Sequence, residues 1–121
     1  MKLRKILPML VLMLLMTAIL PVHAAASDDI IASGLHDHGP VEWKITSDGT
    51  LTISGNRSMQ SYNSPSSYLW SSYADTITKV VVEDGMTTIA NNAFSGMLQL
   101  KEAYIVSTVT EIGVIAFSDC P

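Results

Sequence analysis

Apolar residues recur with a fixed spacing along the second half of this chain. Residues 77–98 (ITKVVVEDGMTTIANNAFSGML, the first repeat) align without a gap on residues 100–121 (LKEAYIVSTVTEIGVIAFSDCP, the second repeat), in a register of 23. Matches that are mostly apolar or small predict two segments that stack and bury equivalent faces. The identical positions are Thr87/Thr110, Ile89/Ile112, Ala93/Ala116, Phe94/Phe117 and Ser95/Ser118.

Each repeat begins with the pattern L-x-x-L-x-L, which is the strand signature of leucine-rich repeats. Their period of 20 to 29 residues includes the 23 found here. The pattern is Ile77-x-x-Val80-x-Val82 in the first repeat and Leu100-x-x-Ala103-x-Ile105 in the second. Alternation along an extended strand then points four side chains inward: Val80, Val82, Ala103 and Ile105. We therefore expect a short solenoid with a parallel ladder.

The intervening residues of these strands point outward and are the predicted partner-binding surface: Lys79, Val81, Glu102 and Tyr104. Parallel stacking in a register of 23 sets Lys79 beside Glu102 and Val81 beside Tyr104. Opposite charges placed in this way stabilise a ladder by about 0.2–1 kcal/mol. Tyr104 is the strongest single candidate for a partner contact, because aromatic residues contribute much of the energy of interfaces. Packing of Tyr104 against Val81 is the competing explanation.

A hairpin is predicted ahead of the repeats. Apolar residues alternate in Val41-Glu-Trp43-Lys-Ile45 and again in Leu51-Thr-Ile53, and Asp48-Gly49 supplies a turn that tolerates positive φ. Residues 61–72 contain six Ser, one Pro and three aromatic residues, which favours an ordered loop fastened to a core. We expect residues 41–76 to act as an N-terminal cap. Residues 25–40 show little pattern and are expected to form a flexible arm.

The first 24 residues have the three parts of a secretory signal peptide. A basic start precedes an apolar run from Ile6 to Leu20, and small residues follow, so cleavage is expected after Ala24 or after Ala26. The run is shorter than the roughly 20 apolar residues of a membrane-spanning helix. We therefore expect an exported protein, secreted or at the cell surface, with no membrane span after cleavage.

Removing the signal makes the chain strongly acidic. Three of the seven basic residues leave with it, so 7 − 3 = 4 remain against 11 acidic residues, a net charge of −7. Nucleic acid is excluded as a partner, because phosphate contacts need clustered cations. Cys120 is the one cysteine and has no internal partner for a disulfide, so stability must come from backbone pairing and an apolar core.

These segments together resemble the start of BspA-like leucine-rich repeat proteins, which are exported bacterial surface proteins. The resemblance rests on the D-G-T-L-T-I-S-G run at 48–55, on the aromatic residues Trp43 and Trp70, and on the I-x-x-x-A-F sequences that end at Phe94 and Phe117. It covers about residues 33–121. It departs from the family where Leu69 replaces a frequent Pro and Met97 a repeat cysteine. The resemblance implies an adhesin-like interaction module, with an extracellular protein or cell-surface ligand as partner.

Candidates for chemistry are few. His36-Asp37-His38 could bind Zn or Ni, but neighbouring ligands in an arm lose entropy on ordering, so we expect a solvated linker and no metal site. Cys120 could be a nucleophile, yet it occupies the repeat position of Met97, which favours a packing role. No nucleophile elbow, phosphate loop or metalloprotease motif is present. We expect no enzyme, no catalytic residue and no cofactor.

The sequence therefore predicts an exported, non-catalytic protein-interaction module. An alternative is an N-terminal structural cap of a longer repeat protein or enzyme-bearing surface protein, with the binding surface elsewhere. A solenoid usually needs about three repeats, and the second repeat is truncated at Pro121. We expect this chain to be a piece of a longer protein or a fragmentary gene product.

Overall fold

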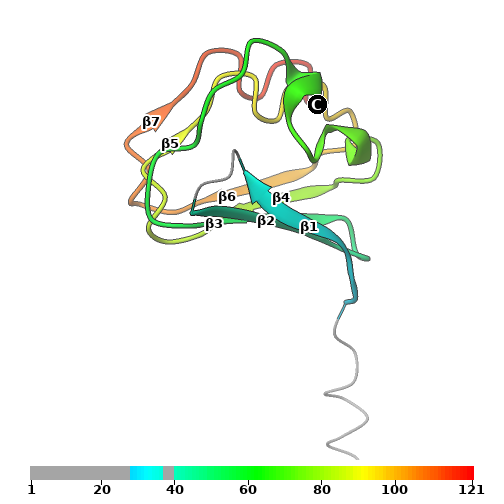
Figure 1. The fold of residues 1–121 in the computed structure, drawn as a ribbon. Coiled ribbons are helices and arrows are strands. Elements are labelled where there is room, and N and C mark those ends of the chain that lie inside the picture. Colours follow the sequence, from blue (N-terminus) through cyan, green and yellow to red (C-terminus); the bar gives the residue numbers. More distant parts are fainter. Residues whose placement is uncertain (1–27, 37–39) are drawn as a thin grey trace, which may run out of the picture.

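The computed structural model describes residues 28–36 and 40–121 (Figure 1), so the expected signal peptide lies outside the described residues. The fold is mainly β, as predicted, and the described residues contain no α-helix. Its strands are β1 (Ile30–His36), β2 (Val41–Thr46), β3 (Thr50–Ser54), β4 (Lys79–Val82), β5 (Thr88–Ile89), β6 (Glu102–Ile105) and β7 (Glu111–Ile112). Two short 3-10 helices, η1 (Pro65–Ser67) and η2 (Ser71–Tyr73), lie between β3 and β4.

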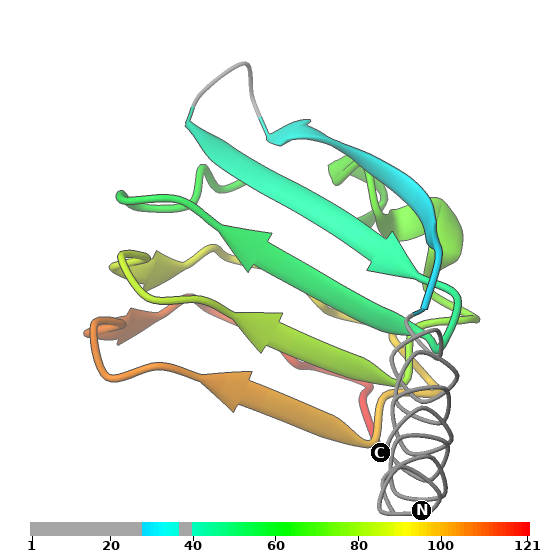
Figure 2. The ribbon, with the colours of Figure 1, turned by 90° about the horizontal axis from the view of Figure 1, so that it is seen from below.

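Five strands form one sheet in the order β1-β2-β3-β4-β6 (Figure 2). β1, β2 and β3 are joined antiparallel, whereas β3, β4 and β6 run parallel. Lys79 pairs with Glu102 and Val81 with Tyr104, so the predicted register of 23 is the register of the ladder. β5 and β7 pair in parallel on the opposite side of the molecule, and the core lies between the two layers (Figure 1).

The flexible arm expected at 25–40 is wrong over residues 30–36. These residues form β1, which pairs antiparallel with β2 from Ile30↔Thr46 to His36↔Val41, with a shift in register between Ile30 and Ala32. Gly34 lies opposite Trp43, and a Cβ at Gly34 would stand 3.1 Å from the indole Nε1. A side chain larger than hydrogen would crowd the ring, so glycine lets the two strands close over the tryptophan.

Alternation along the strands forms the core. Val41, Trp43 and Ile45 on β2 are buried, and Glu42 and Lys44 between them are exposed. On β4, Val80 and Val82 are buried, as predicted.

Ala103 and Ile105 pair with Val80 and Val82 and so lie on the same side of the sheet, as predicted, but the burial expected of them is wrong. Both residues are exposed, and Ile105 keeps 37% of its surface accessible. They lie on β6, the edge strand of the sheet, and no described strand lies beyond it to cover them.

A column of aromatic rings runs through the core from β1 to the second repeat. The ring centroids of Tyr68 and Trp70 are 5.0 Å apart, those of Trp70 and Phe94 are 6.1 Å apart, and those of Phe94 and Phe117 are 5.2 Å apart. His36 stacks on Tyr68 at the other end, at 5.6 Å. Phe94 and Phe117 thus contact each other in successive repeats, as the register of 23 requires. Stacked and tilted rings at such distances contribute about 0.5–1.5 kcal/mol per pair beyond their burial.

The same carbonyl position receives a hydrogen bond in each repeat. In the second repeat, the backbone N–H of Phe94 donates to the Ala116 carbonyl oxygen at 2.9 Å. In the first repeat, the equivalent oxygen belongs to Ala93, and the indole Nε1 of Trp70 donates to it at 2.8 Å. A side chain of the loop therefore supplies the bond that a preceding repeat would supply from its backbone.

Two further side chains of the loop act in the same way. The N–H of Val114 donates to the Asn91 side-chain oxygen at 2.7 Å, and the equivalent N–H of Asn91 donates to the Ser61 hydroxyl at 3.0 Å. The hydroxyl of Tyr68 donates to the Asn91 carbonyl oxygen, whereas the equivalent oxygen of Val114 receives the backbone N–H of Asn92. The Ser-rich loop thus offers the first repeat the hydrogen bonds that the first repeat offers the second.

The turn between β2 and β3 follows the predicted chemistry. Gly49 has a φ of 86°, and the Asp48 carboxylate accepts bonds from the Thr46 hydroxyl at 2.6 Å and from the Thr50 N–H at 3.0 Å. Hydrogen bonds to the charged form, first from Thr46 and then from Thr50, lower the pKa of Asp48.

Replacing Trp70 tests the fastening of the loop. Trp70→Phe keeps an apolar ring but removes the donor, which leaves the buried Ala93 carbonyl without a partner. We expect the free energy of unfolding to fall by about 1–3 kcal/mol in urea denaturation. Leu69→Ala, at the exposed neighbouring position, is the control and should change it by less than about 0.5 kcal/mol. Equal effects of the two substitutions would contradict the fastening role.

Candidate partner-binding surface

The outward side of the five-stranded sheet is one continuous surface, which we call the outer face. One row of paired residues crosses all five strands: Ser33, Lys44, Thr52, Val81 and Tyr104. Neighbouring strands are about 4.8 Å apart, so this row extends over about 19 Å. The outer face therefore includes residues of both the hairpin and the repeats.

The four predicted surface residues lie together at the β4–β6 end of the outer face. The Lys79 ammonium is 3.9 Å from the Glu102 carboxylate and 5.0 Å from the centroid of the Tyr104 ring. Tyr104 keeps 55% of its surface exposed. Exposed ion pairs and exposed cation–π contacts each contribute at most about 1 kcal/mol. Lys79 therefore contacts the tyrosine ring but leaves it exposed.

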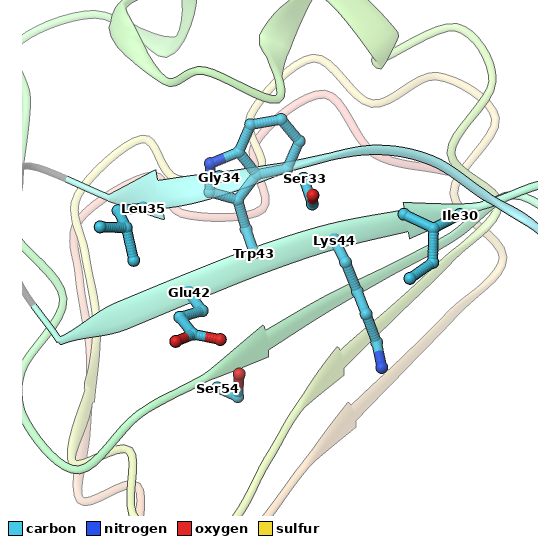
Figure 3. A pocket seen from close by; sticks show the side chains of 8 residues that line it. All are labelled: Ile30, Ser33, Gly34, Leu35, Glu42, Trp43, Lys44 and Ser54. Atoms are coloured by element: carbon cyan, nitrogen blue, oxygen red, sulfur yellow. The ribbon is translucent and has the colours of Figure 1, made fainter.

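A groove at the β1–β2 end of the outer face was not predicted. Its volume is about 400 Å³ (Figure 3), and it is lined by Ile30, Ser33, Gly34, Leu35, Glu42, Trp43, Lys44 and Ser54. Glu42 and Lys44 point to one side of the sheet and Trp43 to the other (Figure 3). The outward direction of Glu42 and Lys44 could have been inferred from the alternation in residues 41–45. The groove could not, because it needs β1, and the sequence of residues 30–36 shows no strand pattern.

His36 is not part of a solvated linker, and the prediction is wrong at this residue. Only 2% of it is exposed, and its Nε2 lies 2.9 Å from the Gln60 carbonyl oxygen. Its ring packs among Tyr62, Tyr68 and Trp70. The other nitrogen, Nδ1, is buried without a hydrogen-bond partner. His36 is therefore a packed core residue, and Asp37 and His38 lie outside the described residues.

Cys120 packs against the core and donates its S–H to the Phe94 carbonyl oxygen at 3.2 Å. Burial raises the pKa of the Cys120 thiol above its usual value, and nearby Asp119 acts in the same direction. A raised pKa reduces the thiolate fraction, which is the reactive form. Within residues 28–36 and 40–121, no three metal-ligating side chains are grouped so that they could hold an ion.

The repeats are similar to those of a known protein family. The family model of a BspA type leucine-rich repeat region (6 copies) matches residues 51–121, more than half of the chain. This chain belongs to the BspA-type leucine-rich repeat family. The crystal structure of a leucine-rich repeat protein from Eubacterium ventriosum is similar to it, with a TM-score of 0.69 and 33% sequence identity. None of the curated proteins is significantly similar to the chain.

The match with the Eubacterium ventriosum protein covers 74% of this chain but 24% of that one, so this chain spans about a quarter of the length of its solved relative. Among the residues that the structure describes, no helix is long and apolar enough to cross a membrane. Membership of this BspA-type family makes the chain a leucine-rich repeat module.

The thiol of Cys120 gives a direct test of its packing. Because its pKa is raised by burial, the folded protein holds less thiolate than the unfolded chain at about pH 8.5. We expect iodoacetamide to alkylate Cys120 several-fold more slowly in the native protein than in urea, as followed by mass spectrometry. Equal rates in the two states would contradict a packed thiol.

Proposed function

We propose that this chain is an exported, non-catalytic, adhesin-like module that binds an extracellular protein or cell-surface ligand through its outer face. The observation that carries this proposal is the exposed Tyr104, which lies beside Val81 and 5.0 Å from the Lys79 ammonium on the open sheet. A rigid aromatic ring on a flat, uncovered strand is the kind of residue that contributes most at interfaces. Residue positions on a paired sheet also lose little entropy when a partner binds.

Export is the second part of the proposal. It is supported by the basic, apolar and small-residue pattern of residues 1–24. We propose a secreted or cell-surface location, because a signal peptide directs the chain out of the cytoplasm. The family relationship also agrees with a location at the surface.

Replacing Tyr104 tests the role of the outer face. Tyr104→Ala should weaken binding of the labelled protein to epithelial cell monolayers by at least about 30-fold, the effect of losing a hot-spot residue of about 2 kcal/mol. Binding can be measured by titrating the fluorescently labelled protein onto the monolayers and reading the bound fluorescence. Tyr104→Phe should retain most of the affinity, because it keeps the ring.

Leu98→Ala serves as the matched control, since Leu98 is also exposed and lies outside the strands of the outer face. The melting temperature of each variant separates the two explanations of Tyr104. Unchanged binding by Tyr104→Ala would refute the proposed surface. A parallel loss of binding and of melting temperature would instead favour packing against Val81.

A second candidate function is a structural cap, with the binding surface in other repeats or beside an enzyme domain of a longer surface protein. It is supported by the unequal burial of equivalent positions. Ile89 is 1% exposed but Ile112 is 54% exposed, and Asn92 is buried whereas Ile115 is 56% exposed. One further repeat stacked on β6 and β7 would cover these side chains as the second repeat covers the first. Absence of cell binding by the unmodified chain would favour this candidate.

A further inference from the structure

Two pairs of opposite charges lie on the outer face, and only one of them forms an ion pair. Lys79 and Glu102 face each other across β4 and β6 and form an ion pair at 3.9 Å. Glu42 and Lys44 lie two positions apart on β2, which separates them by about 6.6 Å along the strand. Within the described part of the chain, neither Glu42 nor Lys44 has an ion-pair partner.

The neighbours of Glu42 and Lys44 carry no charge. Leu35 and Ser54 flank Glu42 on the adjacent strands, whereas Ser33 and Thr52 flank Lys44. Both charged side chains are exposed and line the groove of about 400 Å³. Figure 3 shows them on the same side of the sheet. The groove thus presents one negative and one positive group with no internal counterion.

Apolar and small residues complete the groove. Leu35 lies beside Glu42, and Ile30 lines the groove toward the other end of β1, so each end has an exposed aliphatic side chain. Ser33 and Ser54 are small and leave the space beside the two charged side chains open. The aliphatic stem of a lysine or arginine can pack on such a side chain while its charge reaches a carboxylate.

We propose that this groove binds an extended segment of a partner protein that carries a basic and an acidic side chain two positions apart. In an extended chain, side chains two positions apart point to the same side and are separated by the same distance as Glu42 and Lys44. The basic side chain pairs with Glu42 and packs on Leu35, and the acidic side chain pairs with Lys44. This proposal rests on the proposed function, because it names the partner chemistry for the hairpin end of the outer face.

Synthetic peptides test whether the groove selects one basic and one acidic side chain. Four acetylated five-residue threonine peptides carry lysine then glutamate, two lysines, two glutamates or two glutamines at the second and fourth positions. Binding is followed from amide shifts in the nitrogen-15 spectrum of the protein. We expect the mixed-charge peptide to shift the amides of Glu42, Lys44 and Ser33, and to bind about two- to five-fold more tightly for each matched charge.

Charge inversion makes the test specific. Lys44→Glu should change the preference to the peptide with two lysines, and Glu42→Lys to the peptide with two glutamates. Arg57→Glu and Glu111→Lys are matched controls, since both residues are exposed and neither lines the groove. These two variants should keep the preference of the unmodified protein.

Several outcomes would overturn the groove proposal. They are the absence of shifts at millimolar peptide, an equal affinity for all four peptides, or shifts confined to β1 that ignore charge and so indicate strand addition at the sheet edge. Different results would reject the groove proposal and the proposed function. If Tyr104→Ala abolishes cell binding but the protein shows no peptide preference, the groove proposal alone is rejected. If the protein shows the peptide preference but Tyr104→Ala binds cells normally, the proposed Tyr104 surface alone is rejected.

Discussion

Each layer of this fold depends on hydrogen bonds and ring contacts from the layer before it. A repeat cannot satisfy its own loop carbonyls or cover its own phenylalanine, since these groups face along the stack. The second repeat receives both from the first: the Phe94 N–H bonds the Ala116 carbonyl, and the Phe94 ring contacts Phe117. The first repeat has no repeat before it. The side chains of Trp70, Tyr68 and Ser61 make the equivalent hydrogen bonds to its backbone.

The use of side chains in place of backbone donors explains the composition of the Ser-rich loop at residues 61–72. A loop without regular strands offers few aligned backbone donors, so indole and hydroxyl groups take their place. The rings that carry these groups also extend the aromatic column toward His36, which joins β1 to the same core. Burial of polar side chains in this region is therefore compatible with stability, because most of their polar atoms are bonded.

The stacked core leaves one side of the five-stranded sheet accessible to a partner. Because the core uses the inward side chains, the outward side chains of β1, β2, β4 and β6 remain accessible on one surface, whereas Thr52 in the central strand β3 is buried. That surface is chemically uneven. Its β4–β6 end has an internally paired lysine beside a tyrosine, and its β1–β2 end has two unpaired charges in a groove. A partner that spans both ends would meet an aromatic contact on β6 and a charge-selective contact on β2, three strand positions away.

The repeats and the hairpin could be predicted from the sequence because their signals are local and periodic. The 23-residue spacing predicted the pairing of Lys79 with Glu102, and Asp48-Gly49 predicted the turn. β1 could not be predicted, because the irregular register after Ile30 breaks the alternation, and Gly34 is favoured only by the tryptophan across from it. The burial of His36 likewise depends on rings some 30 residues away in the loop.

The register of the parallel ladder is best tested by nuclear Overhauser contacts between backbone protons of neighbouring strands. We expect parallel-type contacts between Leu51 and Val80 and between Val80 and Ala103, together with ring contacts between Phe94 and Phe117. Contacts that join Val80 to a residue other than Ala103, or phenylalanine rings with no contact, would contradict a stack in which each layer completes the next.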